Sequence, residues 1–380
     1  MNPNNKITIA LYSHVEFYPP TLNAIHYLAQ QYSEVHIVCS NVLNTTWQYP
    51  SNVYVHVVGK HHHIRVFMVK SLLYKAIHFL KYTIKLASFT NKHTTILVCD
   101  YIPLLSIRIV SVFKKLKFLW YHNHDVTELG VNRKYSIGWF AEHNEPKMFS
   151  KIDLFTLPAN ERKQYFPMED LKGRYVWVPN YPSKLLYGNL INHDDIYNNE
   201  LVLIYQGSIA AGHGLETIIS LLRHSIHNTT LKLILKGFIL DTYKATLQLI
   251  IDEHNVQDKV TFVGVTPYQD VPLYTIKAHI GIAIHAGTNR MNSTLGTASN
   301  KIYEYAACGL PVLYYSNEHY DAHLKKYEWA IGVQETAISI SNAISHIILN
   351  YKTLHLGAKA SFESSLNFEH NFNTVLSVLK

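Results

Sequence analysis

Glu304 is the one carboxylate in an otherwise apolar stretch that the sequence predicts to be a helix ending at Gly309. Pro311 then forbids further helix, and residues 312–315 have the apolar pattern of a buried strand. The start of a helix offers unpaired backbone N–H groups to an anion, and a carboxylate there can accept hydrogen bonds from the hydroxyls of a ribose. The alternative is that Glu304 caps or solubilises its helix, as most glutamates in a first helical turn do.

A glycine-rich loop is the second candidate, because it joins a predicted buried strand at residues 201–205 to the next helix. Gly207, Gly212 and Gly214 let backbone N–H groups approach an oxygen-rich ligand, and the dipole of the following helix favours a phosphate. His213, just before that helix, could add a donor or, when protonated, a charge. The alternative is an ordinary turn from strand to helix.

The segment WYHNHDVTE at residues 120–128 places polar side chains directly after an apolar strand. At the carboxyl edge of a parallel sheet, His124 could hydrogen-bond a hydroxyl, and Asp125 could orient the imidazole or accept a proton. His122 and His124 also have the spacing of metal ligands on one strand face, but two histidines without further ligands are a poor site. The chain has no Asp-x-Asp motif, so we expect no metal. The alternative for these histidines is a structural role.

Short apolar strands alternate with helices along both halves of the chain, a pattern typical of parallel sheets covered on both faces. Strands are predicted at residues 6–13, 35–40, 53–58, 95–99, 118–121, 153–157 and 175–178, then at 201–205, 231–235, 260–263, 280–285 and 312–315. The sequence therefore predicts an α/β protein of two doubly wound, Rossmann-like domains, with a ligand in a cleft between them. We expect domains at 1–187 and 201–380, joined by the polar linker 188–200; the last helix could pack back on the first domain.

The composition limits the classes of function. A chain of 380 residues, 48% hydrophobic and only 16% charged, can bury large cores and is not extensively disordered. The net charge of +7 favours anionic partners, but no dense Lys/Arg run or nucleic-acid signature is present, so we expect no nucleic acid. Three cysteines at core-like positions, Cys39, Cys99 and Cys308, indicate reduced thiols and a cytoplasmic protein. The N-terminus lacks a signal-peptide pattern, and no apolar run reaches the roughly 18 residues that span a bilayer.

Residues 61–93 combine a helical apolar pattern with six Lys or Arg side chains and no acid. The apolar positions are Val69, Leu72, Leu73, Ala76, Ile77, Leu80, Ile84 and Leu86. Packing of a helix against the core of its domain explains such a face. A basic amphipathic helix also fits an anionic membrane surface, and the missing acids favour peripheral docking there.

The order strand–Gly–loop–Gly–helix, followed by N-K-x-x-E-Y-x-A-x-G-x-P-V, resembles the donor half of GT-B-fold glycosyltransferases. It is most similar to the family-4, retaining sugar transferases that build bacterial surface glycans, over most of residues 200–330. The resemblance implies that Glu304 holds the ribose of a nucleotide-diphosphate sugar. It implies that four preceding residues lie near the sugar and phosphates: Ala298, Ser299, Asn300 and Lys301. It also implies that His124, followed by Asp125, approaches the transferred sugar or the acceptor, and that no metal is needed.

Three positions depart from the pattern of that family. The family has a second Glu eight positions before the first, facing the donor sugar, and this chain has Gly296 there. Arg and Lys usually contact the diphosphate where this chain has Ser208 and His213, so Lys301 and Arg290 are the candidates for the missing positive charge. The glycine-rich loop that commonly follows the first strand is replaced by HVEFYPP.

We therefore expect a glycosyltransferase that moves a hexose-type sugar from a nucleotide-diphosphate donor to a saccharide or lipid-linked acceptor in surface glycan synthesis, with retention. No cofactor beyond the donor is expected. If the reaction instead inverts, Asp125 or Glu128 is the candidate base. The expected location is cytoplasmic, with peripheral attachment to the inner face of the cell membrane as an option. Two alternatives are a nucleotide-sugar epimerase of the same fold, which needs no acceptor, and a catalytically weakened subunit that binds the nucleotide sugar.

Overall fold

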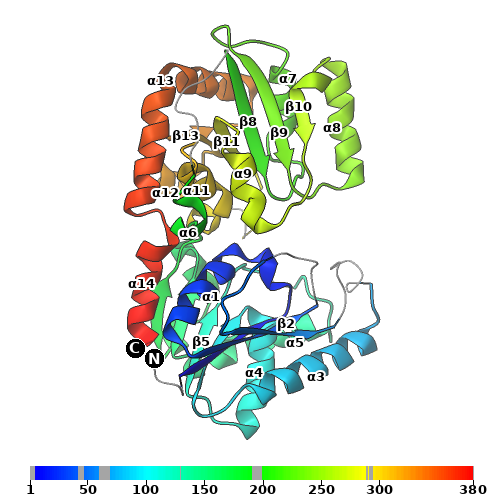
Figure 1. Ribbon diagram of the computed structural model, residues 1–380. Helices are drawn as coiled ribbons and strands as arrows, with labels where there is room; N and C mark the ends of the chain where they lie inside the picture. Colours follow the sequence, from blue (N-terminus) through cyan, green and yellow to red (C-terminus); the bar gives the residue numbers. More distant parts are fainter. Residues whose placement is uncertain are drawn as a thin grey trace. The chain divides into compact units, whose positions relative to one another are not determined.

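The chain forms two compact units, each built around one parallel sheet (Figure 1). The computed structural model describes residues 5–41, 47–59, 69–128, 130–190, 199–287, 290 and 294–379. Unit 1 contains the residues up to Pro179 and those from Phe372 onward, and unit 2 contains Asn180–Asn371. The predicted α/β class with two Rossmann-like domains is confirmed.

Unit 1 has the strand order β3-β2-β1-β4-β5-β6-β7 within the described residues. The strands are β1 (Lys6–Leu11), β2 (Glu34–Ser40), β3 (Val53–Val58), β4 (Thr94–Cys99), β5 (Phe118–His122), β6 (Leu154–Leu157) and β7 (Arg174–Trp177). Leu11 pairs with Cys99, and Cys99 pairs with His122, so the segments after these three strands leave the sheet at one edge. The strand order reverses between β1 and β4, which is where sheets of this kind bind ligands.

The helices of unit 1 are α1 (Pro19–Gln31), α3 (Leu72–Ser88), α4 (Tyr101–Phe113) and α5 (Ile137–Asn144). Helix α3 begins at Leu72 because the Ser71 hydroxyl accepts a hydrogen bond from the Tyr74 N–H and so caps the first turn. Its buried side chains are His78, Tyr82, Thr83 and Leu86. Of the eight apolar positions predicted for its core face, only Leu86 is buried, so that part of the prediction is wrong. The start of the predicted basic stretch, residues 61–68, lies outside the described residues.

Unit 2 has the strand order β10-β9-β8-β11-β12-β13 within the described residues. The strands are β8 (Glu200–Gln206), β9 (Thr230–Lys236), β10 (Val260–Phe262), β11 (Ile280–Ala283), β12 (Val312–Tyr315) and β13 (Ala330–Val333). The helices are α7 (Leu215–Leu221), α8 (Asp241–Glu253), α9 (Val271–Thr275), α11 (Asn300–Ala307), α12 (Glu318–Leu324) and α13 (Ala337–Ser364). Helix α11 ends as expected, because Gly309 adopts a φ of +74° and the Leu310 N–H turns back to the Tyr305 carbonyl.

The boundary between the units lies at Pro179 rather than in the predicted linker 188–200. The short helix α6 (Lys184–Tyr187) belongs to unit 2, because Tyr187 is buried in the core of that unit and the Ser183 hydroxyl donates to Glu369. Residues 191–198 of the predicted linker lie outside the described part of the chain. The last helix, α14 (Phe368–Leu379), belongs to unit 1 from Phe372 onward, where the Phe372 ring contacts those of Tyr27 and Trp120.

Candidate functional site

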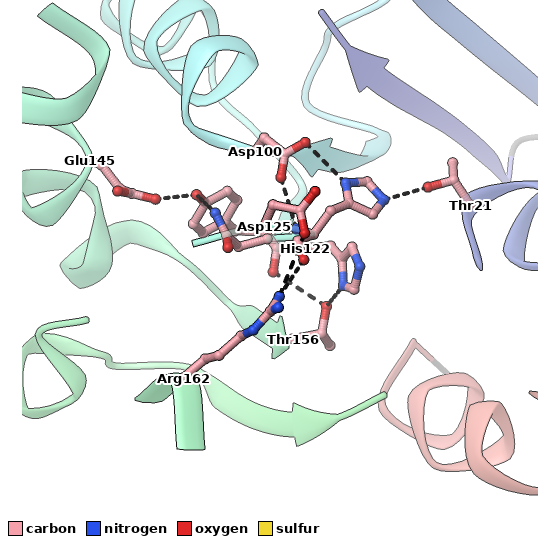
Figure 2. A network of polar contacts seen from close by, with 10 residues as sticks. Thr21, Asp100, His122, Asp125, Glu145, Thr156 and Arg162 are labelled. Carbon is pink, nitrogen blue, oxygen red and sulfur yellow. Dashed lines mark hydrogen bonds and ion pairs between the residues drawn. The ribbon is translucent and has the colours of Figure 1, made fainter. Parts of the chain in front are cut away.

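The first candidate site lies at the carboxyl ends of β4 and β5 in unit 1, where Asp100, Asp125 and Arg162 come together (Figure 2). His124 makes three hydrogen bonds at this edge. Its Nδ1 is 3.0 Å from Asp100 Oδ2, and its Nε2 is 2.7 Å from Thr21 Oγ1. Its backbone N–H donates to Asp100 Oδ1 at 2.8 Å. Both nitrogens of this buried ring are therefore engaged within unit 1, and the carboxylate that orients the ring is Asp100, not Asp125 as the sequence suggested.

Asp100 is a site residue that the sequence reasoning missed. It follows β4 directly, its N–H donates to the His122 carbonyl at 2.9 Å, and its φ of +69° lies in the left-handed region. That conformation costs energy for a residue other than glycine, and the two hydrogen bonds to His124 help to hold it. A signal was present, since the apolar run TTILVC ends in Asp beside a strand that ends in His.

Asp125 and Arg162 add charge to the same edge (Figure 2). The Asp125 side chain is 63% exposed, and its Oδ1 lies 3.9 Å from Nη1 of the fully buried Arg162. The same Nη1 donates to the His124 carbonyl at 2.5 Å, so Arg162 fixes the backbone on which His124 and Asp125 stand. Desolvation raises the pKa of the Asp125 carboxyl, and the nearby Arg162 opposes the rise.

The histidine pair does not form a metal site in the described residues. The His122 Nδ1 is 2.8 Å from the Thr156 hydroxyl, and its ring meets that of His124 edge to face at 4.6 Å. Burial, with His124 and Arg162 nearby, lowers the pKa of His122 far below its usual value, so the ring is neutral. No group of three or more His, Cys, Asp or Glu side chains that could hold a metal ion occurs in the described part of the chain.

A pocket of about 200 Å³ adjoins these groups and is lined by residues of unit 1 alone. Its lining includes Ser13, Tyr18, Asp100, Tyr101 and Asp125. The pocket lies at the ends of β1 and β4, where the strand order reverses. Aromatic faces together with hydroxyl and carboxylate groups suit a small polyhydroxylated ligand, which can stack on the rings and donate to the oxygens.

The second candidate site lies in unit 2 around Glu304, which is buried in the second turn of α11. Its Oε2 accepts a hydrogen bond from Gln206 Nε2 at 2.6 Å, and the Tyr268 hydroxyl also bonds to the carboxylate. Burial raises the pKa of Glu304, against the opposing effects of Tyr268, Gln206, Lys301 and Lys236. Glu304 is buried and its carboxylate accepts hydrogen bonds from Gln206 and Tyr268, so it neither solubilises α11 nor caps its first turn.

Lys301 joins α11 to the end of β8. Its Nζ donates to the Tyr205 hydroxyl at 2.9 Å and lies 4.1 Å from the centre of the Tyr205 ring. Burial lowers the pKa of Lys301 to about 7, although the nearby Glu304 carboxylate opposes that shift. The low pKa means that nearby groups do not fully offset the cost of burying the ammonium charge. A bound anion would stabilise the charged form.

His213 does not supply positive charge near neutral pH. Its ring stacks on Tyr205, with Nδ1 2.7 Å from the Tyr205 hydroxyl, and burial together with Lys301 lowers its pKa to about 4. His285, just after β11, meets the His213 ring at 4.6 Å, and its own pKa is lowered by burial. Its buried Nδ1 has no hydrogen-bond partner among the described residues. The sequence reasoning did not single out His285, which lies five residues before Arg290 in a stretch of no recognisable motif.

The glycines of the glycine-rich loop adopt positive φ angles, which other residues rarely do. Gly207 has a φ of +121° and Gly214 a φ of +69°, and a side chain at the neighbouring Gly237 would lie only 1.8 Å from the Gly207 carbonyl. The Gly214 N–H, which the sequence offered to a phosphate, already donates to Glu335 Oε1 at 3.0 Å. Ser208 is exposed and its carbonyl accepts from the Tyr205 hydroxyl.

The loop before α11 brings some of the remaining predicted residues together. Ser299 is buried before the first turn of α11, and Asn300 Oδ1 is buried with no hydrogen-bond partner among the described residues. The Ala298 carbonyl accepts from Asn180 Nδ2 at 2.8 Å, which braces the loop. The Arg290 carbonyl accepts a hydrogen bond from Thr294 Oγ1 at 2.6 Å, and most of the sequence neighbours of Arg290 lie outside the described residues.

Two features near Glu304 were not expected. Lys236, at the end of β9, is buried, donates to Thr266 Oγ1 at 2.6 Å and has a pKa lowered by burial against the effect of Glu304. At Gly296 a Cβ would lie 2.8 Å from His323 Cδ2, so a histidine side chain fills the space beside the position where the resembling family has its second Glu.

The fold and one family model define the class to which this chain is similar. The chain has the GT-B fold: it superposes over 99% of both chains on Anabaena Alr3699/HepE in complex with UDP and glucose, with a TM-score of 0.68 and 13% identity. Sucrose-phosphate synthase (tll1590) from Thermosynechococcus elongatus gives 0.68 at 14% identity, with 99% of this chain and 98% of that one covered. WaaG, a glycosyltransferase involved in lipopolysaccharide biosynthesis, gives 0.66 at 12% identity, with 98% of each chain covered.

Residues 189–361 match the family model described as "Glycosyl transferases group 1". The matched segment contains the whole Glu304 site and excludes the His124 site. No curated protein is detectably similar in sequence. The family match and the fold together support a GT-B glycosyltransferase.

Proposed function

We propose that the protein transfers a hexose-type sugar from a nucleotide-diphosphate donor to a saccharide or lipid-linked acceptor, with retention at the anomeric carbon, in the synthesis of a surface glycan. The observation that carries the proposal is the buried Glu304 with Lys301 and Lys236, inside the segment that matches a glycosyltransferase model. Neighbours of this fold that bind UDP, with glucose or as UDP-glucose, support a nucleotide-sugar donor.

Unit 2 holds the donor in this proposal. Glu304 accepts hydrogen bonds from the ribose hydroxyls, and Lys301 with the start of α11 faces the diphosphate. A preorganised cation beside the leaving diphosphate stabilises the charge that develops as the glycosidic bond breaks, and it does so without reorganising solvent. We propose that this positive charge, rather than a bound metal, stabilises the leaving nucleoside diphosphate, so the reaction needs no cofactor beyond the donor.

Unit 1 supplies the acceptor site in this proposal. Asp125 is exposed at the mouth of a pocket with aromatic and hydroxyl groups, so it can receive a hydrogen bond from an acceptor hydroxyl. Both ring nitrogens of His124 are already bonded, to Asp100 and Thr21. His124 therefore acts on the acceptor only by holding the segment that carries Asp125. Under retention, a donor phosphate oxygen helps to remove the acceptor proton.

The experiment is a two-stage screen. Thermal shift against a panel of nucleoside diphosphates and nucleotide sugars, with and without EDTA, identifies the donor through the stabilisation that binding confers. Transfer from that donor to saccharide and lipid-linked acceptors is then followed, and the anomeric configuration of the product is read by NMR. Absence of a shift with every nucleotide would contradict the proposal, and an EDTA-sensitive transfer would contradict its metal-free form.

A second candidate, a catalytically weakened subunit that binds a nucleotide sugar, is favoured by two residues. Gly296 carries no carboxylate for the sugar, and His213 is neutral where the resembling family has a cation. Saturable donor binding without transfer to any acceptor, and without hydrolysis, would select this candidate. Turnover of the nucleotide sugar alone into an epimer would instead select an isomerase.

A further inference from the structure

The solvent side of helix α3 is apolar, which is unusual for a surface helix. Leu73, Leu80 and Ile84 are 71%, 59% and 61% exposed, and Ile77 between them is also exposed. Positions 73, 77, 80 and 84 follow the spacing i, i+4, i+7 and i+11, so these four side chains form one stripe along the helix. We call this stripe the α3 stripe.

The opposite side of α3 attaches the helix to unit 1 by polar and aromatic groups. The Tyr82 hydroxyl donates to the Val38 carbonyl at 3.3 Å, and the Thr83 hydroxyl donates to Ser106 Oγ of α4 at 3.0 Å. These contacts fix which side of the helix faces the sheet. The α3 stripe is therefore left without a covering element among the described residues of unit 1.

The end of α4 extends this apolar surface. The Lys114 ammonium group donates to the Ala87 and Thr90 carbonyls, which ties the end of α4 to the end of α3. Next to Lys114, Phe113 is 83% exposed and Val112 is exposed as well. Figure 1 shows α3 in blue and α4 in cyan, on the same side of the sheet of unit 1.

The charge carried by these two helices and the segments that follow them has one sign, apart from one acid. Residues 69–122 contain nine Lys or Arg side chains and a single acid, Asp100. Asp100 is at the carboxyl edge of the sheet, where it is bound to His124. Lys81 and Lys85 stand beside the α3 stripe on the same helix. A partner for this surface must therefore accept apolar side chains and present negative charge.

We propose that α3 and the end of α4 dock on the surface of an anionic lipid bilayer, with the α3 stripe and Phe113 entering the boundary between headgroups and acyl chains. A helix that has an apolar face flanked by lysines and no acid lies in the plane of such an interface, held by apolar burial and by attraction to anionic lipid. No described helix is long and apolar enough to cross a membrane, which agrees with docking on the surface. The proposal does not depend on the chemistry proposed for the two sites.

The test measures partitioning of the full chain onto vesicles of phosphatidylcholine with or without 30% phosphatidylglycerol. We expect binding to the anionic vesicles at low salt, and weaker binding when salt shortens the range of the charge attraction. Leu73→Ser combined with Leu80→Ser should lower the partition coefficient about tenfold or more, because it removes two apolar side chains from the interface. Lys81→Glu combined with Lys85→Glu should lower it on the anionic vesicles specifically.

The matched control is Leu249→Ser on α8 of unit 2, a leucine that is also 71% exposed, and it should leave partitioning unchanged. Phe113→Trp provides a second measurement that does not destabilise the helix, and its fluorescence should shift to the blue on anionic vesicles. Absence of binding at low salt, or an equal loss in the Leu249→Ser control, would overturn the proposal. Concentration-dependent dimers that the α3 variants abolish, without vesicle binding, would overturn it in favour of a second copy of the chain.

Discussion

The carboxyl edges of the two sheets differ in how their charged and polar groups are bonded and exposed. At the edge of unit 1, His124 has both ring nitrogens bonded within the protein, and the Asp125 side chain is exposed to solvent. At the edge of unit 2, the half-buried Lys301 has a pKa of about 7, and Asn300 Oδ1 and His285 Nδ1 are buried without hydrogen-bond partners among the described residues. In unit 1, Asn123 Oδ1 is also buried without a hydrogen-bond partner among the described residues, but unit 2 combines such atoms with a lysine whose charged form a bound anion would stabilise.

This difference suggests that the edge of unit 2 determines nucleotide affinity and the edge of unit 1 determines the rate of transfer. Buried polar groups left unbonded cost stability, and natural sites tolerate that cost where a ligand completes the network. Changes in unit 2 should therefore act mainly on nucleotide affinity. Changes to the exposed group in unit 1 should act mainly on the rate, with little effect on either affinity or stability.

The largest effect should come from Asp125→Ala. A positioned carboxylate that takes part in proton transfer typically contributes about 10²- to 10⁴-fold in rate, so transfer should fall by that order. Nucleotide affinity and the unfolding temperature should stay near the parent values, because the side chain is exposed and bound only loosely to Arg162. Steady-state transfer kinetics and calorimetry would measure these three quantities.

Glu128→Gln is the matched control, since Glu128 is the other acid in the same segment. A parent-like rate in Asp125→Ala together with a slow Glu128→Gln would assign the hydrogen bond with the acceptor hydroxyl to Glu128 instead of Asp125. If both variants transfer at the parent rate, the edge of unit 1 is structural and does not determine the rate of transfer.

A smaller effect is expected from Glu304→Ala, which should weaken nucleotide binding roughly ten- to hundredfold. A hydrogen bond to a charged group is worth about 1.5–3 kcal/mol, and the variant also leaves the amide of Gln206 without its acceptor. Glu304→Gln keeps the shape and should show an intermediate loss. Titration calorimetry with the nucleoside diphosphate is decisive, provided that the unfolding transition remains cooperative; an unchanged affinity in a folded Glu304→Ala protein would show that Glu304 is structural.

The sequence predicted the local structure best where one segment carries all the signals. The helix that follows Ser299 and contains Glu304, and the loop from Gly207 to Gly214 between a strand and a helix, lie where the sequence predicted them, because glycine, proline and helix signals lie within a few residues of each other. Asp100 and Arg162 were missed, because their roles depend on contacts over 24 and 38 residues that only the strand register creates. Periodicity does not encode such contacts.

Helix α3 shows the second limit of the sequence. Its apolar period correctly predicted a helix, but a period identifies a face without identifying what that face meets. The side of α3 that packs on unit 1 instead carries His78, Tyr82 and Thr83. His78 and Tyr82 bond to the carbonyls of Val58 and Val38 in the sheet, and Thr83 bonds to Ser106 of α4. In α3 the polar side chains that have hydrogen-bond partners are buried, and most of the leucines are exposed.

The smallest expected effect is a pH dependence of donor binding that separates the two edges further. The pKa of Lys301 is lowered from 10.5 to about 7, so the free site is mainly cationic at pH 6 and mainly neutral at pH 9. If the diphosphate binds the cationic form, binding raises this pKa and takes up a proton, so affinity should fall above pH 7 by at most about tenfold per pH unit. A nucleotide sugar is the right probe, because its diphosphate diester does not titrate in this range. Lys301→Arg stays charged throughout and should bind with an affinity that is nearly independent of pH between 6 and 9. A flat profile in the parent protein, or the same slope in Lys301→Arg, would mean that Lys301 does not face the diphosphate.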